Sequence, residues 1–249
     1  MTEAAIRDRL VEHGCRAFEA PATTTEFTGN PEADALIIDL DQHPHAFVLA
    51  CLMSRGVKAE KAWLIPYLIS QQLGNFAIDS LGNLSIGDIE KLMSGPPSLH
   101  RYHGKMAEAF HSGVQRISSR YGGDAFGIWQ GNLPSAEVVF RFLEFRGAGP
   151  KIATMAVNIL ASYFKIPFQE LSSIDVSADT HVRQVFGRLG LCAPDASVEE
   201  VIFKARALYP RFPGVMDLPC WEIGRDWCKP RNPQCAQCYM DELCPKRSL

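Results

Sequence analysis

Four closely spaced cysteines near the end of the sequence constrain the fold of this chain more than any other feature. Cys228, Cys235, Cys238 and Cys244 follow one another with the spacing C-x6-C-x2-C-x5-C and make up half of the eight cysteines. Prolines at 230, 233 and 245 interrupt the segment, so it cannot continue as a helix. Because the segment has little apolar content of its own, it must fold around something else, and four thiolates can converge on one metal centre.

An iron-sulfur cluster, a zinc ion and disulfides are the alternatives for these cysteines. Zinc modules usually present two Cys-x-x-Cys pairs, whereas this segment has one, at Cys235 and Cys238. Disulfides are disfavoured because the N-terminus carries acids early and lacks the basic and then apolar pattern of a secretion signal. We therefore expect a reducing, intracellular, cytoplasmic environment.

Apolar residues recur with a period near 3.6 along most of the chain, and no run alternates as a strand would. The sequence thus predicts an all-α fold, and its 249 residues allow one large or two small domains. No apolar run approaches the roughly 20 residues that span a bilayer. Residues Thr23–Asp34 read as a surface connector. The helices expected are one around residues 6–11, one over 47–53, one from 62 with a kink or restart at Pro66, and others at 86–93, 104–120, 136–145, 150–164, 179–189 and after the capping box at Ser197.

The net charge of −3 is unevenly distributed. Residues 1–44 hold nine acids and three arginines, a net of −6, which leaves +3 for residues 45–249. A modestly basic body behind an acidic N-terminal arm is compatible with a surface that faces DNA.

The stretch Leu143–Ala153 contains a glycine-rich turn between two predicted helices. Gly147 and Gly149 allow backbone angles that other residues avoid, and Pro150 suits the first position of a helix. Such a turn can aim backbone N–H groups at an anion such as a DNA phosphate. Taken alone, the turn is more often explained as a plain connection between two core helices.

Asp179 opens the helix predicted after residue 178. Taken alone, an aspartate at this position is explained by N-capping, because its carboxylate accepts hydrogen bonds from the first free amides of a helix.

The order of the glycine turn ending in Lys151, then Asp179-Thr180-His181, then the four cysteines resembles the helix-hairpin-helix (HhH-GPD) DNA glycosylases of the endonuclease III type. The resemblance extends from the hairpin to the C-terminus. It implies a [4Fe-4S] cluster on the four cysteines, Lys151 as nucleophile and Asp179 as catalytic carboxylate. It also allows a monovalent or divalent cation at the hairpin.

The same resemblance implies a two-lobed fold. The expected lobes are a six-helix barrel domain over residues 45–165, which carries the hairpin, and a second helical domain built from residues 1–44 and 166–249, which holds the cluster. The implied partner is double-stranded DNA with a damaged or mispaired base, bound by a nucleoid-associated monomer that acts in base excision repair.

Elementary chemistry agrees with the role implied for Lys151. In the first turn of a helix the positive end of the dipole disfavours an ammonium, which leaves more neutral amine to attack C1′ of a deoxyribose and form a Schiff base. A solvated lysine or a phosphate contact is the alternative. An ionised Asp179 can stabilise the oxocarbenium-like sugar as the base departs.

Three departures from the family pattern bear on the substrate. The hairpin begins Phe145-Arg146-Gly147 where the family usually has Leu-Pro-Gly. The segment Phe168–Ser177 before the aspartate is longer than usual. The third concerns the glutamine that relatives insert into the duplex, which could correspond to Gln72 or to the Ser54-Arg55-Gly56 stretch. The second placement is favoured, because the buried helix that normally precedes this glutamine is better matched by Phe47–Met53.

The sequence therefore predicts a DNA glycosylase with AP lyase activity by β-elimination. Two alternatives are a monofunctional glycosylase, in which Asp179 activates water, and a non-catalytic iron-sulfur DNA-binding protein. The expected DNA contacts are Arg55, Gln72, Arg146, Gly147, Gly149, Lys229 and Arg231.

Overall fold

A computed structural model describes residues 2–21 and 26–246 of the chain. In these residues every regular element is an α-helix or a short 3-10 helix, and no strand occurs. The predicted all-α class is therefore confirmed. Two compact units make up the chain, one from residues 1–22, 132–139 and 153–249, the other from residues 23–131 and 140–152.

The second of these units, which we call the hairpin unit, surrounds one fully buried helix. Its helices are α2 (Pro31–Ile38), α3 (Pro44–Met53), α4 (Ala59–Leu73), α5 (Ile78–Gly82), α6 (Ile86–Ser94) and α7 (His103–Tyr121), with a 3-10 turn at Ala125–Ile128. All ten residues of α3 are buried, which follows from a sequence that contains no Asp, Glu, Lys or Arg. α3 packs against α2, α4 and α7.

Close packing of side chains around α3 fixes the positions of the helices in this core. Gly113 of α7 faces Leu49 and Leu52, and a Cβ added at Gly113 would lie 2.9 Å from Leu52 Cδ1. Trp129 stacks on Phe142 with ring centroids 6.4 Å apart and meets Phe47 edge to face at 6.0 Å. Large buried aromatic rings of this kind contribute most of the apolar area that stabilises a small helical core.

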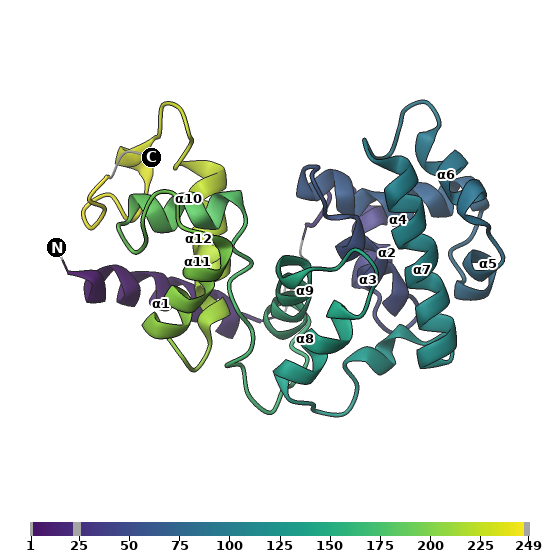
Figure 1. Cartoon of the computed structure of the whole chain (residues 1–249), viewed down its shortest axis with the longest axis horizontal. Helices are drawn as coiled ribbons and strands as arrows, with labels where there is room; N and C mark the ends of the chain where they lie inside the picture. The colour runs from purple at the N-terminus through teal and green to yellow at the C-terminus, as the bar shows by residue number, and fades with distance from the viewer. Residues whose placement is uncertain (1, 22–25, 247–249) are drawn as a thin grey trace. The chain divides into compact units, whose positions relative to one another are not determined.

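The first unit, which we call the cysteine unit, joins the two ends of the chain. It contains α1 (Glu3–Glu19), α10 (Thr180–Arg188), α11 (Val198–Leu208), α12 (Asp217–Asp226) and 3-10 turns at Pro213–Met216 and Cys235–Gln237. Figure 1 shows the purple α1 and the green to yellow C-terminal helices of this unit. α8 (Ser135–Leu143) and α9 (Pro150–Ser162) each contribute residues to both units.

Two glycines allow the helices of the cysteine unit to approach closely. A Cβ at Gly14 of α1 would lie 2.0 Å from the carbonyl oxygen of Val215, and one at Gly224 of α12 would lie 2.6 Å from His181 Cβ. Neither distance is possible for a real Cβ, so α1 and α10 can hold these positions only while residues 14 and 224 are glycine.

The predicted helices are largely confirmed, with boundary shifts of one to three residues at most ends. α4 runs continuously through Pro66, so it does not restart there. The predicted connector over residues 23–34 is wrong at its end, because α2 begins at Pro31 behind an Asn30 cap, and residues 23–25 lie outside the described part of the chain. α5 and α12 were not predicted at all.

The contact-based units differ from the domain boundaries predicted at residues 45 and 165. Residues 26–44 belong to the hairpin unit, where α2 packs on α3 and α4 and Phe27 stacks on Trp63 at 4.6 Å. Residues 153–165 belong to the cysteine unit. None of the described helices is both long and apolar enough to cross a membrane.

Candidate functional site

The hairpin between α8 and α9 has the glycine-dependent geometry that the sequence predicts. Gly147 has a φ of +92°, a conformation that a residue with a Cβ adopts only at a cost in free energy. The Ala148 amide donates to the Phe145 carbonyl at 3.0 Å, and the Ile152 amide donates to the Gly149 carbonyl at 3.0 Å. A Cβ at Gly149 would meet nothing within 4 Å, so the backbone there is open to a ligand.

Lys151 is exposed in the first turn of α9, which is the position predicted for it. Arg146, also exposed, forms an ion pair with Glu108 of α7 at 2.5 Å. Exposed pairs of this kind contribute little to stability, so Arg146 can leave Glu108 at little cost in free energy. Lys151 belongs to the hairpin unit and Asp179 to the cysteine unit.

Asp179 is the N-cap of α10. Its Oδ1 accepts hydrogen bonds from the amides of His181 and Val182, each at 2.9 Å. The side chain is half-buried. The capping explanation is therefore correct, and it is compatible with chemistry because the two amides fix the direction of the carboxylate.

Two carboxylates of the segment Phe168–Ser177, those of Glu170 and Asp175, fix this segment before Asp179. Glu170 accepts hydrogen bonds from the amides of Ser135 at 2.9 Å and Ser172 at 2.6 Å, and from both hydroxyls. Burial alone would raise the pKa of Glu170, but these hydrogen bonds outweigh it and lower the pKa to about 2. Asp175, nearly buried, forms a bidentate ion pair with Arg206 at 2.7 and 2.8 Å.

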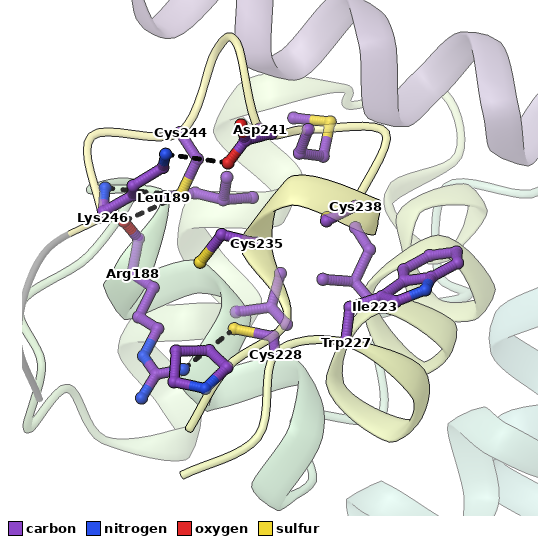
Figure 2. A pocket seen from close by; sticks show the side chains of 13 residues that line it. Arg188, Leu189, Ile223, Trp227, Cys228, Cys235, Cys238, Asp241, Cys244 and Lys246 are labelled. Atoms are coloured by element: carbon purple, nitrogen blue, oxygen red, sulfur yellow. Dashed lines mark hydrogen bonds and ion pairs between the residues drawn. The ribbon is translucent and has the colours of Figure 1, made fainter. Parts of the chain in front are cut away.

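The four cysteines of the C-terminal segment line a single cavity of about 200 Å³. Figure 2 shows them on the yellow loop, with Ile223 of α12 and Trp227 just after that helix on one side. Arg188 of α10 and Leu189 just after that helix lie on another side. All four are half-buried, and none forms a disulfide. The spacing seen in the sequence therefore does bring these side chains to one place.

Two side chains of α10 that the sequence analysis did not identify hold the entry to this loop. Arg188 Nη1 lies 3.4 Å from Cys228 Sγ and donates to the Lys229 carbonyl at 2.7 Å, and Gln184 donates to the Cys228 carbonyl. Their spacing of four residues on one helix face was the available signal. The Arg188 guanidinium can donate a hydrogen bond to the Cys228 sulfur.

The cavity carries the donor set of a metal centre. Zinc and iron-sulfur centres both bind four cysteine thiolates. Among the described residues, no group of three or more His, Cys, Asp or Glu side chains is placed so that it could hold a metal ion as it stands. Burial raises the pKa of the Cys238 and Cys244 thiols, so a bound iron centre would have to displace their protons. Four cysteine thiols on the wall of one cavity are the donor set that an iron-sulfur cluster requires.

The two basic residues predicted to meet DNA on this loop differ in their surroundings. Lys229 is half-buried, and its ammonium donates to the Arg225 carbonyl at the end of α12. Arg231 is exposed. Arg231 is thus better suited to a phosphate contact, while Lys229 also serves to close α12.

A basic and aromatic surface surrounds Arg55 in the loop between α3 and α4. Arg55 is exposed, and its carbonyl accepts from Nε2 of the buried His100 at 3.1 Å. Tyr102, 47% exposed, stacks under the Arg101 guanidinium at 4.7 Å, and Arg101 Nη2 would lie 2.8 Å from a Cβ at Gly56. The stretch Pro97–Met106 is rich in basic and aromatic residues, but no local pattern in the sequence connects it to Arg55.

Gln72 lies in the last turn of α4. Its amide donates to the carbonyls of Leu68 at 3.4 Å and Leu92 at 3.3 Å. Gln72 and Arg55 are the two side chains that the sequence analysis considered for insertion into the duplex. The side-chain amide of Gln72 is engaged with two carbonyls, so Arg55 is the better candidate.

Comparison with known proteins relates the fold to solved structures. No protein-family model and no curated protein matches the chain. A trapped endonuclease III–DNA covalent intermediate is similar over 99% of this chain and 97% of its own, with a TM-score of 0.65 at 18% identity. A thermostable thymine-DNA glycosylase is similar over 96% and 95%, with a TM-score of 0.65 at 14% identity.

A third solved structure is the 8-oxoguanine glycosylase/lyase of Clostridium acetobutylicum in complex with double-stranded DNA. The similarity covers 91% of this chain and 77% of that one, with a TM-score of 0.57 at 17% identity. These likenesses extend over nearly the whole chain but are too distant in sequence to carry more than architecture. The chain therefore has the helical fold shared by endonuclease III and these DNA glycosylases.

Proposed function

We propose that this protein is a DNA glycosylase that extrudes a damaged or mispaired base and cleaves its N-glycosidic bond, with strand cleavage by β-elimination. One observation carries the proposal. A hairpin that requires glycine at 147 ends in an exposed lysine, in a fold shared with glycosylases that have been captured on DNA. A plain connection between helices needs neither the open backbone at Gly149 nor a lysine at position 151.

Lys151 is the nucleophile in this proposal. Its neutral Nζ attacks C1′ of the deoxyribose as the bond to the base breaks, and the base leaves with the bonding electrons and takes up a proton. Loss of the amine proton and opening of the sugar ring give a Schiff base. Removal of a C2′ proton then expels the 3′ phosphate, and water later releases the lysine.

Asp179 supplies negative charge near the sugar. Its Oδ1 is bound by the amides of His181 and Val182, so the carboxylate cannot rotate freely. A carboxylate fixed before the reaction stabilises a developing positive charge without reorganising.

The proposed contacts with DNA follow the hairpin and the two loops. The backbone at Gly147 and Gly149 receives a phosphate, with Arg146 released from Glu108 to assist. Arg231, with Lys229, approaches the backbone from the cysteine loop, and Arg55 fills the gap left by the extruded base while Tyr102 and Arg101 support it. Gln72 is the less favoured candidate for that role. Neutralising several phosphates would make binding depend on salt.

We further propose that Cys228, Cys235, Cys238 and Cys244 hold a [4Fe-4S] cluster. The support is the cavity of about 200 Å³ with four thiols on its wall and the Arg188 guanidinium beside Cys228. When bound, the cluster supplies four metal–sulfur bonds that fix the loop. A monovalent or divalent cation at the hairpin stays a prediction.

Borohydride trapping on duplexes that carry different lesions tests the activity. Wild-type protein should give a covalent complex with at least one lesion, and Lys151→Ala should lose it while still binding the duplex. Lys105→Ala is a matched control, because Lys105 is also exposed in the first turn of a helix of the same unit. Lys105→Ala should trap as wild type does.

The other outcomes separate the alternatives. Base release without trapping would identify a monofunctional glycosylase, in which Asp179 activates water. Binding without base release on every lesion would identify a non-catalytic DNA-binding protein and overturn the proposal. The lesion that reacts fastest defines the substrate class.

A further inference from the structure

The backbone immediately before Asp179 is strained. Ala178 is buried, 4% exposed, and has a φ of +43°, in the left-handed region where a residue with a Cβ is disfavoured by about 1–2 kcal/mol. Such a conformation persists only where the surroundings impose it, and it is found most often at functional sites. The contacts of the neighbouring residues must therefore hold Ala178 in this conformation.

Asp217, the first residue of α12, binds the residue before Ala178. Its Oδ1 accepts from the Ser177 amide at 2.6 Å and from the Ser177 hydroxyl at 2.8 Å. Ser177 is 5% exposed and Asp217 is half-buried. Both hydrogen bonds end on one carboxylate oxygen, so they tie Ser177 to the first residue of α12.

The chain just before Asp217 binds the same segment at a second point. The Gly214 amide donates to the Ile174 carbonyl at 2.7 Å. A Cβ at Gly214 would lie 2.7 Å from that carbonyl oxygen, so the two backbones are as close as they can be. The start of α12 is therefore fixed relative to residues 174–177.

α12 also touches the chain on the other side of Asp179. Gly224, two turns beyond Asp217, lies against His181, with no room for a Cβ. His181 is the residue whose amide is capped by Asp179. One rigid helix thus contacts the segment that enters Asp179 and the first turn that leaves it.

From these contacts we infer that Asp217 is a positioning residue for the Asp179 carboxylate. By holding Ser177, Asp217 keeps Ala178 in its strained conformation, and that conformation sets the direction from which Asp179 caps α10. The inference rests on the proposed function, because it assigns Asp217 a role in the step that Asp179 assists. Asp217 itself touches neither substrate nor reacting atoms in this scheme.

Three variants distinguish a positioning role of Asp217 from an ordinary structural contact. Asp217→Asn keeps an oxygen that can accept both bonds from Ser177, whereas Asp217→Ala removes it. Glu170→Ala is the matched control, because it releases the same segment at its other end, from Ser135 and Ser172, and leaves Ser177 bound to Asp217.

The experiment measures the single-turnover rate of base release and the Kd for duplex with each variant of the full-length protein. Asp217→Ala should lower the rate by about 10- to 100-fold, as displacement of a catalytic group by about 1 Å does. Its Kd should stay within about threefold, and Asp217→Asn should restore most of the rate. Glu170→Ala should lower the melting temperature and leave the rate within about threefold.

A double-mutant cycle with Asp179→Asn tests whether Asp217 acts through Asp179. If it does, Asp217→Ala causes little further loss once Asp179 is neutralised, since effects of coupled residues do not add. An equal fold-loss in both backgrounds, or a loss in Glu170→Ala as large as in Asp217→Ala, overturns the inference.

A measurement that uses no DNA tests the positioning role of Asp217 independently of the proposed glycosylase activity. Amide hydrogen exchange of His181 and Val182 should accelerate in Asp217→Ala and not in Asp217→Asn. Unchanged exchange in Asp217→Ala refutes the positioning role even if the protein is a glycosylase. Accelerated exchange in a protein that releases no base refutes the glycosylase and leaves Asp217 as an organiser of the α10 cap.

Discussion

Replacing Gly147 and Gly149 by alanine, one at a time, separates the folding of the hairpin from its contact with DNA. At Gly147, with φ at +92°, a Cβ would crowd the following carbonyl oxygen, at a free-energy cost of about 1–2 kcal/mol. The new Cβ would also lie 3.4 Å from Ala109 Cβ, a tight contact but no clash. At Gly149 the φ is not in the left-handed region and the added Cβ meets nothing within 4 Å.

The two substitutions should therefore have opposite profiles. A cost of about 1–2 kcal/mol lowers the melting temperature of Gly147→Ala by about 2–8 °C for a chain of this size. Gly149→Ala should leave the melting temperature unchanged or raise it slightly, because alanine restricts the unfolded chain by about 0.4–1 kcal/mol. In the proposed complex, however, its methyl group would occupy the space through which a phosphate reaches the backbone, so the Kd for DNA should rise about tenfold, or about 1.4 kcal/mol.

Calorimetry and fluorescence anisotropy measure the two effects. Anisotropy should be recorded on a duplex with an abasic-site analogue at several salt concentrations, since phosphate contacts set the salt dependence. Two results would refute the reasoning: a melting temperature in Gly149→Ala as low as in Gly147→Ala, or a Kd in Gly149→Ala equal to that of wild type.

Three further expectations concern the cysteine cavity and two titrating side chains. Purified protein should contain about four iron and four sulfide per chain, Cys228→Ser should lose both, and zinc without iron would contradict the cluster. Because the folded pKa of Glu170 is lowered to about 2, its contribution to stability is full above its ordinary pKa and is lost as pH falls toward 2; Glu170→Gln should flatten the melting temperature over that range, and an unchanged acid profile would argue against it. Burial, with Lys61 and Arg101 nearby, lowers the pKa of His100, whose Nδ1 accepts from the Tyr102 amide, so unfolding titrations below about pH 6.5 should show a loss of stability that His100→Gln lacks.

Much of the helical fold could be predicted because most helices carry an apolar stripe of period 3.6. α12 was missed because its buried face consists of Pro219, Cys220, Ile223 and Gly224, and a face that includes a proline and a glycine gives a weak helical pattern in the sequence. α2 was missed because Asn30 and Pro31 were interpreted as part of a connector, although a cap followed by proline at the first position also marks a helix start.

The residues of the candidate site also fall into those that the sequence identifies and those that it does not. The four cysteines and the hairpin are local in sequence, so spacing alone identified them. Asp217 acts on Ser177 from 40 positions away, and Glu170 on Ser135 from 35. Contacts of that kind are set by how helices pack, and no local pattern in one sequence reveals them.

The packing of α1 has a consequence for how the chain folds as it is synthesised. Ile6 and Leu10 of α1 are buried in the cysteine unit, and Gly14 rests on Val215, about 200 residues later in the sequence. At about 5–20 residues per second, α1 leaves the ribosome roughly 10–40 s before its partners exist. The hairpin unit, whose helices are nearly contiguous in sequence, can form during that interval. We therefore expect nascent chains stalled before residue 213 to be protected from protease over residues 31–121 while residues 3–19 are still cleaved.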